Sequence, residues 1–314
     1  MSMVRNIYHD MVFARADETD AVFYFTHKDF ENLNCVEFPF SSSDGHTLQG
    51  YFYSYPNPVS GRLIIFDHGM GSGHTGYMKE IEKLASHGFL VFAYDHTGCM
   101  KSGGETTGGF VQSLKDLNDA VNTLRATEEY KNIDISVIGH SWGAFSSMNI
   151  CALHPEISHI VALSGFISVE CFIKQHLGAF YKKVYEEEEV MNPEFIKYNA
   201  VESLSHTDAH TLIIHSDDDK TVKCGASFDV LQKELSHKEN IRFLKVSGKN
   251  HNPNYTLDAV ECKDDFFFEY RKAIRKNIFK TTQEKHAFRS KFDWDRMTQQ
   301  DEDIWNIIFE VLDK

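Results

Sequence analysis

The length, composition and charge of the chain exclude several classes of protein. Its 314 residues are 42% hydrophobic, enough to bury the core of one large domain or two smaller ones, so a disordered chain is excluded. Lys and Arg number 32 against 46 Asp and Glu, and the formal net charge of -14 would repel phosphate backbones and anionic lipid surfaces over most of the molecule. We therefore expect no nucleic-acid partner.

The cysteines and the first residues indicate the compartment. The six cysteines are scattered without CxxC spacing, which favours reduced thiols over a zinc knuckle or a disulfide framework. Asp10, Asp17 and Glu18 stand where a signal peptide needs apolar residues, and no apolar run reaches membrane-spanning length. We expect a cytoplasmic protein without stable membrane insertion, and we leave its oligomeric state open.

Short apolar runs alternate with helical segments along most of the chain. The first two predicted strands flank the turn-rich segment 41–45 and should form an antiparallel hairpin. Runs around Val91, Ile138 and Ile213 are apolar throughout, as strands buried on both faces require. The pattern predicts an α/β fold, a mostly parallel central sheet of about eight strands flanked by helices. Strands are predicted at 35–40, 48–53, 63–67, 89–94, 135–139, 159–163, 211–215 and 241–246, and helices at 77–87, 112–127, 142–153 and 224–235.

Three parts of the chain depart from this alternation. Residues 1–34 are expected to be an N-terminal extension to one domain that spans 35–314. At about 166–210 we expect a small cap insert, which should cover the site and determine specificity. In the tail, 265–276 and 305–312 are predicted to be charged amphipathic helices that pack on the sheet.

The motif Gly139-His140-Ser141-Trp142-Gly143 is a G-x-S-x-G between a predicted strand and a predicted helix. A sharp strand-to-helix turn forces the serine into a strained backbone conformation, and glycines are needed beside it because side chains there would collide with neighbouring backbone. The helix that follows points its amide groups and its positive dipole end at the same spot. This context is typical of a nucleophile elbow and predicts Ser141 as a nucleophile.

A serine hydroxyl needs a base to become a good nucleophile, and the base needs a third group to orient it. Asp217, Asp218 and Asp219 follow the predicted strand at 211–215, and His251 follows the next strand along the chain. Catalytic groups in open α/β sheets gather at the carboxyl ends of the strands, here in the order Ser, Asp, His. We expect His251 to be the general base and one of the three carboxylates to orient it.

The loop after the third predicted strand should complete an oxyanion hole. The oxyanion hole needs two backbone amides. We expect one from Trp142, directly after the nucleophile, and the second from the loop after the third strand, as is usual where the nucleophile lies at a strand-turn-helix. Segment 67–73 is rich in glycine, which lets the backbone approach a reacting carbonyl, and Met70 is the expected donor. His68 and Gly69 are expected to shape the loop, His68 by hydrogen bonding rather than as a catalytic base.

With these motifs the sequence resembles the α/β-hydrolase superfamily. It is similar to a branch of small serine esterases, monoacylglycerol-lipase-like enzymes and serine-aminopeptidase-like peptidases. The resemblance covers about residues 48–254 and rests on three patterns. HGxGxxxxxY corresponds to residues 68–77, GHSxG to 139–143 and HGxxDxxV to 215–222.

The resemblance also decides among the three carboxylates, because the last pattern places the family's catalytic acid on Asp219. Two residues depart from the family. Met100 and Ser216 stand where glycine is usual, so the loops near the site should be shaped differently. Neither departure removes a catalytic group.

A different class of function is visible in the same region. Gly71, Gly73 and Gly76 form a G-x-G-x-x-G after a predicted strand, and Asp95 ends the next strand. This combination is the fingerprint of a dinucleotide-binding oxidoreductase, in which the glycines admit a pyrophosphate and the carboxylate binds a ribose. It leaves the serine motif and the downstream histidine as coincidences.

We predict a serine hydrolase that cleaves a carboxylic ester, or an amide, of a small molecule through an acyl-enzyme, with no cofactor. A non-catalytic ligand-binding homologue, an acyltransferase and a C–C bond hydrolase stay open as alternatives, because a fold does not fix its function. His215 with the neighbouring aspartates could hold a metal, but a strand-end loop followed by lysine is a weak cage, so we expect no metal. Substrate identity and acyl-chain length stay open.

Overall fold

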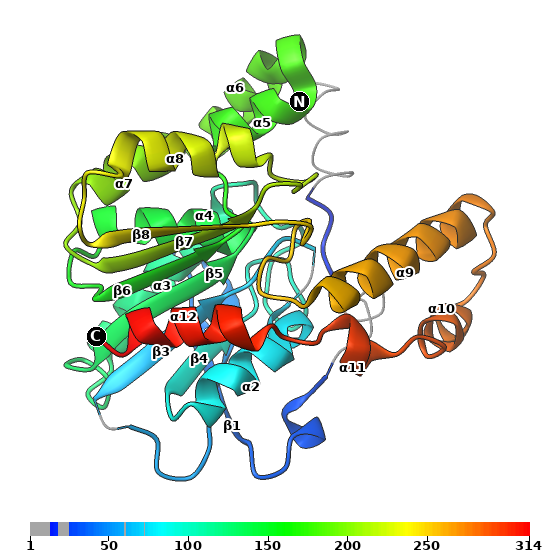
Figure 1. Cartoon of the computed structure of the whole chain (residues 1–314), viewed down its shortest axis with the longest axis horizontal. Coiled ribbons are helices and arrows are strands. Elements are labelled where there is room, and N and C mark those ends of the chain that lie inside the picture. Colours follow the sequence, from blue (N-terminus) through cyan, green and yellow to red (C-terminus); the bar gives the residue numbers. More distant parts are fainter. Residues whose placement is uncertain (1–12, 18–24, 60, 72) are drawn as a thin grey trace.

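The computed structural model describes residues 13–17, 25–59, 61–71 and 73–314. Within these ranges one eight-stranded sheet crosses the molecule in the order β1-β2-β4-β3-β5-β6-β7-β8 (Figure 1). β2 pairs antiparallel with β1 and β4, and the other neighbours are parallel. The predicted fold class is confirmed. The strands are β1 (Asn34–Ser41), β2 (Thr47–Ser54), β3 (Arg62–Asp67), β4 (Leu90–Tyr94), β5 (Asp134–His140), β6 (His159–Leu163), β7 (His210–Ser216) and β8 (Ile241–Val246).

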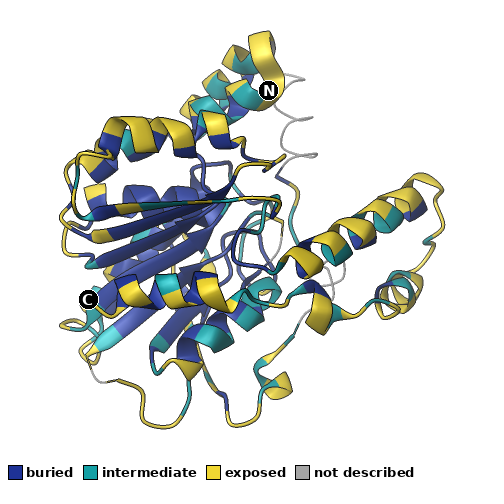
Figure 2. Cartoon of the chain, viewed as in Figure 1, coloured by how far each residue is buried: buried dark blue, intermediate teal, exposed yellow. Residues whose placement is uncertain are grey.

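The central strands are buried on both faces because their apolar runs supply a side chain to each. In β3, Leu63 and Ile65 belong to the core on one face of the sheet, whereas Ile64 and Phe66 belong to the core on the other. Successive side chains of a strand point to opposite faces, so an uninterrupted apolar run is needed where helices cover both. Figure 2 shows these strands buried beneath helices whose outer faces are exposed.

Helices pack on both faces of the sheet. One core includes side chains of α3 (Gln112–Ala126), α4 (Trp142–Asn149), α7 (Ala200–Ser205) and α8 (Phe228–Leu235). The other includes those of α2 (Met78–Ser86) and α12 (Glu302–Leu312). α12 contacts β6 and β7, which confirms that the predicted helix at 305–312 packs on the sheet.

The register of the parallel strands aligns their carboxyl ends at one edge of the sheet. Asp67 of β3 lies opposite Gly139 of β5, and His140 lies opposite Leu163 of β6. Ser216 of β7 lies opposite Val246 of β8 in the same way. The loops that carry the predicted site residues therefore leave the sheet side by side.

Two helices, α5 (Val169–Leu177) and α6 (Tyr181–Met191), come between β6 and β7 together with α7. α5 and α6 pack on each other and lie beyond the layer formed by α7 and α8 (Figure 1). Glu188 of α6 is buried and accepts hydrogen bonds from the backbone N–H of Phe110 at 3.1 and 3.2 Å. This contact ties the segment to the loop before α3.

The tail corrects one prediction. The predicted helix at 265–276 belongs to α9 (Leu257–Arg275), which extends away from the sheet and packs on α11 (Trp294–Met297) rather than on the strands (Figure 1). α10 (Thr282–Arg289) lies at its far end. The apolar side of α9 faces an aromatic cluster in which the Phe266 ring contacts Phe292 and Trp294. No helix of the described residues is both long and apolar enough to cross a membrane.

Parts of the N-terminal segment 1–34 lie outside the described residues. Where it is described, its backbone bridges Ala14 to Thr106 and Ala16 to Cys99. The Arg15 guanidinium donates to the carbonyls of Met100, Ser102 and Gly104 at 2.6 to 2.9 Å. Met100, which replaces a glycine of the family pattern, has a φ of 47°, so the segment holds a loop in which a residue with a side chain adopts a left-handed conformation.

Candidate active site

Ser141 lies at the sharp turn between β5 and α4. Its φ is 57° and its ψ is -109°, a conformation that residues with side chains rarely adopt. Its amide donates to the carbonyl of Leu163 at 2.8 Å, which fixes the turn to the end of β6. A Cβ at Gly139 would collide with the Gly143 carbonyl, and one at Gly143 with the Asp67 carbonyl. The glycines therefore permit the turn that raises the serine out of the sheet.

The three adjacent aspartates have different partners. Asp219 is buried, and its Oδ2 accepts from His251 Nδ1 at 2.8 Å. Asp217 is exposed and accepts from the Ser247 hydroxyl, and Asp218 is exposed and accepts from the Asn250 amide at 2.9 Å. Of the three, Asp219 is the carboxylate that contacts His251.

The local backbone holds the Asp219 carboxylate in place. Its Oδ1 accepts from the amides of Thr221 and Val222 at 2.8 and 2.9 Å. Burial raises the pKa of the carboxyl, but hydrogen bonds from His215 and His251 outweigh burial and hold this pKa well below its usual range. The group is therefore ionised at neutral pH and can stabilise a positive charge on His251. Among the described residues, no group of three or more His, Cys, Asp or Glu side chains could hold a metal ion.

A hydrogen-bonded chain that the sequence did not reveal joins His251 to the loop after β3. His140 Nε2 donates to the His251 carbonyl at 2.6 Å. The Tyr77 hydroxyl donates to His140 Nδ1 at 2.9 Å and accepts from the Gly69 amide at 3.1 Å. Burial, helped by nearby His251, lowers the pKa of His140 to about 3, so the ring is neutral as these contacts require. The only signal in the sequence was that both residues belong to family patterns.

Ser216, the second departure from the family pattern, links the loop that carries Asp219 to the loop that carries His251. Its hydroxyl donates to Asp218 at 2.6 Å and accepts from the Lys249 amide at 3.0 Å. Glycine could make neither bond. The serine thus ties the loop that carries Asp219 to the loop that carries His251.

The predicted oxyanion loop is fixed by a buried histidine. His68 Nδ1 donates to the Gly69 carbonyl at 2.8 Å, and its Nε2 accepts from the His96 amide at 3.0 Å. Burial lowers the pKa of His68 to about 3, so the ring stays neutral. Met70, which follows Gly69 in this loop, lines the same pocket as Ser141. Trp142 begins α4, where backbone N–H groups have no partner within the helix.

Behind this loop lies a buried charge cluster that sequence reasoning also missed. His96 Nε2 lies 2.8 Å from Asp67 Oδ1, and its Nδ1 lies 3.2 Å from Asp116 Oδ2. Burial lowers the pKa of His96, but the two carboxylates outweigh burial and raise it to about 9. Asp67 also accepts from Ser146 of α4, so the cluster joins the loops after β3 and β4 to α3 and α4. Removing one member would leave an uncompensated buried charge.

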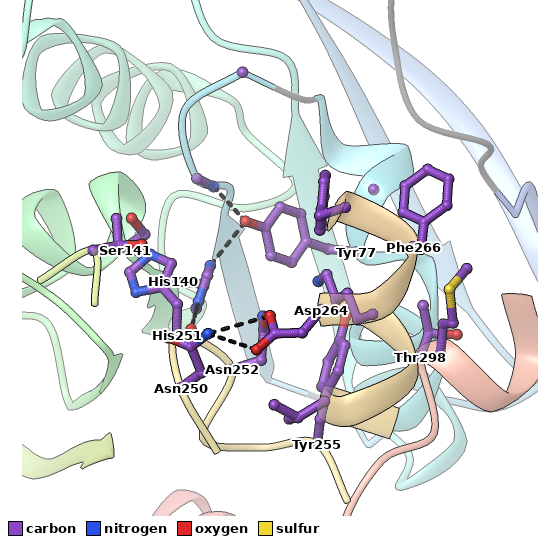
Figure 3. Close-up of a pocket in the computed structure, with 18 of the residues that line it drawn as sticks. Tyr77, His140, Ser141, Asn250, His251, Asn252, Tyr255, Asp264, Phe266 and Thr298 are labelled. Carbon is purple, nitrogen blue, oxygen red and sulfur yellow. Dashed lines mark hydrogen bonds between the residues drawn. The ribbon is translucent and has the colours of Figure 1, made fainter. Parts of the chain in front are cut away.

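Ser141 and His251 line one pocket of about 780 Å³. No hydrogen bond joins the side chains of Ser141 and His251 in the described residues, where His251 Nδ1 bonds to Asp219. Ser141 and His251 lie at one end of the pocket, and Phe266 and Thr298 lie at the other (Figure 3).

The far wall of the pocket comes from a different segment than the predicted cap insert. It comes from 255–298, that is from α9, α11 and the segment before them, and none of the residues that line this pocket falls in 166–210. Five aromatic side chains line this wall together with four charged ones, Lys263, Asp264, Asp265 and Arg271. Burial lowers the pKa of Lys263 to about 8, against the opposing effect of Glu80. The wall also includes Tyr255, Phe266, Phe267, Phe268, Trp294 and Met297.

The positions of Asp95 and Gly73 do not fit a dinucleotide-binding site. Asp95, the expected ribose ligand, is 1% exposed and accepts from the backbone and ring nitrogens of His74 at 3.0 and 2.7 Å. A Cβ at Gly73 would lie 2.5 Å from the same carboxylate, so this glycine faces a side chain rather than an open phosphate site. Ser72, inside the glycine motif, lies outside the described residues.

Comparison with known proteins finds sequence similarity over part of the chain. Residues 59–200 match the model of the serine aminopeptidase S33 family, a stretch that includes Ser141 but ends before Asp219 and His251. Over this stretch of sequence and in its fold, the chain is similar to members of the α/β-hydrolase superfamily. A monoglyceride lipase homolog of monkeypox virus is 29% identical over 37% of this chain and 43% of its own length. Rat monoglyceride lipase is 31% identical over 40% of this chain and 42% of its own length, so the matches span about two fifths of these relatives.

Similarity to solved structures covers more of the chain than the sequence matches do. The Pyrococcus furiosus esterase Pf2001 covers 82% of this chain and 97% of its own, with a TM-score of 0.60 at 22% identity. Est1E from Butyrivibrio proteoclasticus, solved with ferulic acid bound, covers 74% of this chain and 98% of its own, with a TM-score of 0.58 at 19% identity. At these low sequence identities, the similarity shows that this chain shares the fold of these proteins.

Proposed function

We propose that this α/β-hydrolase cleaves carboxylic esters through an acyl-enzyme on Ser141. The observation that carries the proposal is the 2.8 Å hydrogen bond between His251 Nδ1 and the buried carboxylate of Asp219, at a pocket that Ser141 also lines. The carboxylate holds the imidazole proton on Nδ1, so Nε2 is left as the base. Monoglyceride lipases and esterases among the similar proteins support an ester over an amide.

The reaction follows from these positions. His251 Nε2 takes the proton of the Ser141 hydroxyl as its oxygen attacks the ester carbonyl, and Asp219 stabilises the imidazolium that forms. The amides of Met70 and Trp142 are proposed to hold the negative oxygen of the tetrahedral intermediate. His251 then returns the proton to the leaving alcohol, which gives the acyl-enzyme. Water, deprotonated by the same imidazole, releases the acid and restores the serine.

Labelling and mutation test this proposal together. A fluorophosphonate should modify Ser141, as mass spectrometry of the digested protein would show, and Ser141→Ala should lose both the label and nitrophenyl ester hydrolysis while keeping its thermal transition. Ser146→Ala is not a suitable control because its hydroxyl bonds to buried Asp67, whereas Ser205, at the exposed end of α7, can be replaced without touching the site. Ester hydrolysis that survives in Ser141→Ala would refute the mechanism.

The pocket also supports a substrate class. Its volume is within the range of small-molecule sites, and its aromatic wall suits an ester with a bulky apolar group. We propose that α9 and α11, rather than α5 and α6, determine specificity. Phe267→Ala should raise KM for long-chain nitrophenyl esters more than for the acetate, whereas Leu177→Ala, at an exposed position of α5, should change neither. Equal effects of the two variants would contradict the assignment.

A further inference from the structure

Charge is segregated along the tail of the chain. Against a net charge of -14 for the whole chain, residues 270–292 contain Lys and Arg at eight positions and one acidic residue, Glu284. The preceding half of α9 is acidic, with Asp258, Glu261, Asp264 and Asp265. The eight cations are Arg271, Lys272, Arg275, Lys276, Lys280, Lys285, Arg289 and Lys291. We call residues 268–292, which also include Glu269, the basic tip.

Apolar side chains are exposed among these cations. Phe268 is 62% exposed, Ile274 50% and Ile278 55%, and they are among the most exposed large apolar residues of the described chain. Phe268, Arg271, Lys272 and Arg275 are spaced three and four residues apart, so they lie on one side of α9. A helix end that presents cations and large apolar groups together has the composition of an interfacial segment.

The basic tip is built as a folded projection. α9 carries it away from the sheet to one end of the molecule, where α10 packs beside it (Figure 1). Beneath the exposed face, the rings of Tyr270, Phe279 and Phe288 contact one another at 5.3 to 6.1 Å between centroids. The exposed residues therefore stand on an aromatic core of their own.

At least four of the eight cations are exposed and available to an external partner, whereas Arg289 is buried within the tip. Arg271, Arg275, Lys276 and Lys280 are exposed and form no ion pair with the described residues, whereas Lys272 pairs with Glu269 at 3.1 Å. Phe268 and Arg271 also line the pocket that holds Ser141, so a partner bound at the tip would lie beside that pocket.

We propose that the basic tip docks this protein on an anionic lipid surface. Clustered Lys and Arg are attracted to acidic headgroups, and the apolar side chains gain free energy by entering the boundary between headgroups and acyl chains. A nucleic acid would satisfy the cations but would leave Ile274 and Ile278 in water. The acidic remainder of the protein would be repelled by the same membrane, which orients the molecule with the tip toward the lipid.

Vesicle co-sedimentation of the full chain at low salt tests the proposal without relying on hydrolysis. The protein should sediment with vesicles of phosphatidylcholine and phosphatidylglycerol and stay in solution with phosphatidylcholine alone. Arg275→Gln with Lys276→Gln should lower the partition coefficient roughly 25-fold, about fivefold for each cation. The matched control Lys182→Gln with Lys183→Gln, at exposed positions of α6, should change it by less than about twofold.

The apolar contribution has its own variant pair. Ile274→Asn with Ile278→Asn should lower partitioning at least roughly tenfold, whereas Val190→Asn, at an exposed position of α6, should leave it unchanged. Circular dichroism checks that each variant keeps its helices. Equal binding to both kinds of vesicle, no binding to either, or unchanged binding of the Arg275 and Lys276 variant would overturn the proposal. Binding to a DNA duplex in place of vesicles would also overturn it.

Discussion

Replacing Asp219 by asparagine exchanges one carboxylate oxygen for an NH₂ group, and the contacts of the two oxygens determine which of them is exchanged. Oδ1 of the aspartate accepts from two backbone amides, those of Thr221 and Val222, and Oδ2 accepts from His251 Nδ1. The oxygen of an asparagine side chain would stay with the two amides, because an NH₂ group cannot accept from them. The NH₂ group would then face His251 and donate to Nδ1.

That donation favours the wrong tautomer of the base. With Nδ1 accepting, the proton of neutral His251 moves to Nε2, the nitrogen that must receive the serine proton. The neutral asparagine also no longer stabilises the imidazolium that forms in the transition state. A loss of roughly 10⁴-fold in turnover is expected for such a change, with little change in substrate binding.

The neighbouring aspartates provide matched controls. Asp217→Asn removes an acceptor from the Ser247 hydroxyl, and Asp218→Asn weakens bonds to Ser216 and Asn250, so each should cost less than roughly tenfold. Nitrophenyl ester turnover of the three variants would be measured side by side, with thermal unfolding to show that each is folded. Full activity of Asp219→Asn, or a larger loss in Asp218→Asn, would refute the assigned orienting carboxylate.

Further predictions concern the buried histidines and their partners. Tyr77→Phe should lower the free energy of unfolding by about 1 to 3 kcal/mol, because it leaves His140 Nδ1 and the Gly69 amide without their partner. It should also lower kcat, and an unchanged kcat would contradict a positioning role. Acid should destabilise the fold, because His68 and His140 are held neutral with pKa values of about 3 against 6.5, so unfolding takes up protons between these limits. The free energy of unfolding in urea should fall by about 1.4 kcal/mol per pH unit for each group, and equal midpoints at about pH 7 and about pH 5 would contradict it.

The strands could be predicted from sequence because burial on both faces leaves a direct trace in it. The strands at 159–163 and 241–246 have the predicted bounds, and the other strands agree within about one residue at each end. The turn at Ser141 could be predicted for a similar reason, since only glycines fit beside it. The contact between Asp219 and His251 was implied by the family register and by the rule that strand ends meet at one edge.

The connections between these residues could not be predicted, because they join side chains far apart in the chain. The chain from Gly69 through Tyr77 and His140 to the His251 carbonyl needs a three-dimensional register that no local pattern encodes. The contacts of the buried His96 could not be predicted either, because the sequence of a strand-end loop does not indicate which groups pack around its His and Asp side chains. Ser216 had been identified as a departure from the family, but its bond to the Lys249 amide depends on the neighbouring loop.

The tail shows the limit of both composition and periodicity. The pattern at 265–276 indicated correctly that a helix has an apolar side, but it could not indicate what covers that side, which is the aromatic cluster of α9 and α11 instead of the sheet. A net charge summed over the chain likewise hid a segment of opposite sign. Because α9 borders the pocket from Val260 to Arg271 and carries the basic tip from Phe268 onward, one segment after His251 contributes to two proposed features, the specificity wall and the lipid-binding surface. Substitutions at Phe267 and at Arg275 should therefore separate: the first should change the preference among esters in solution, and the second should change vesicle binding alone.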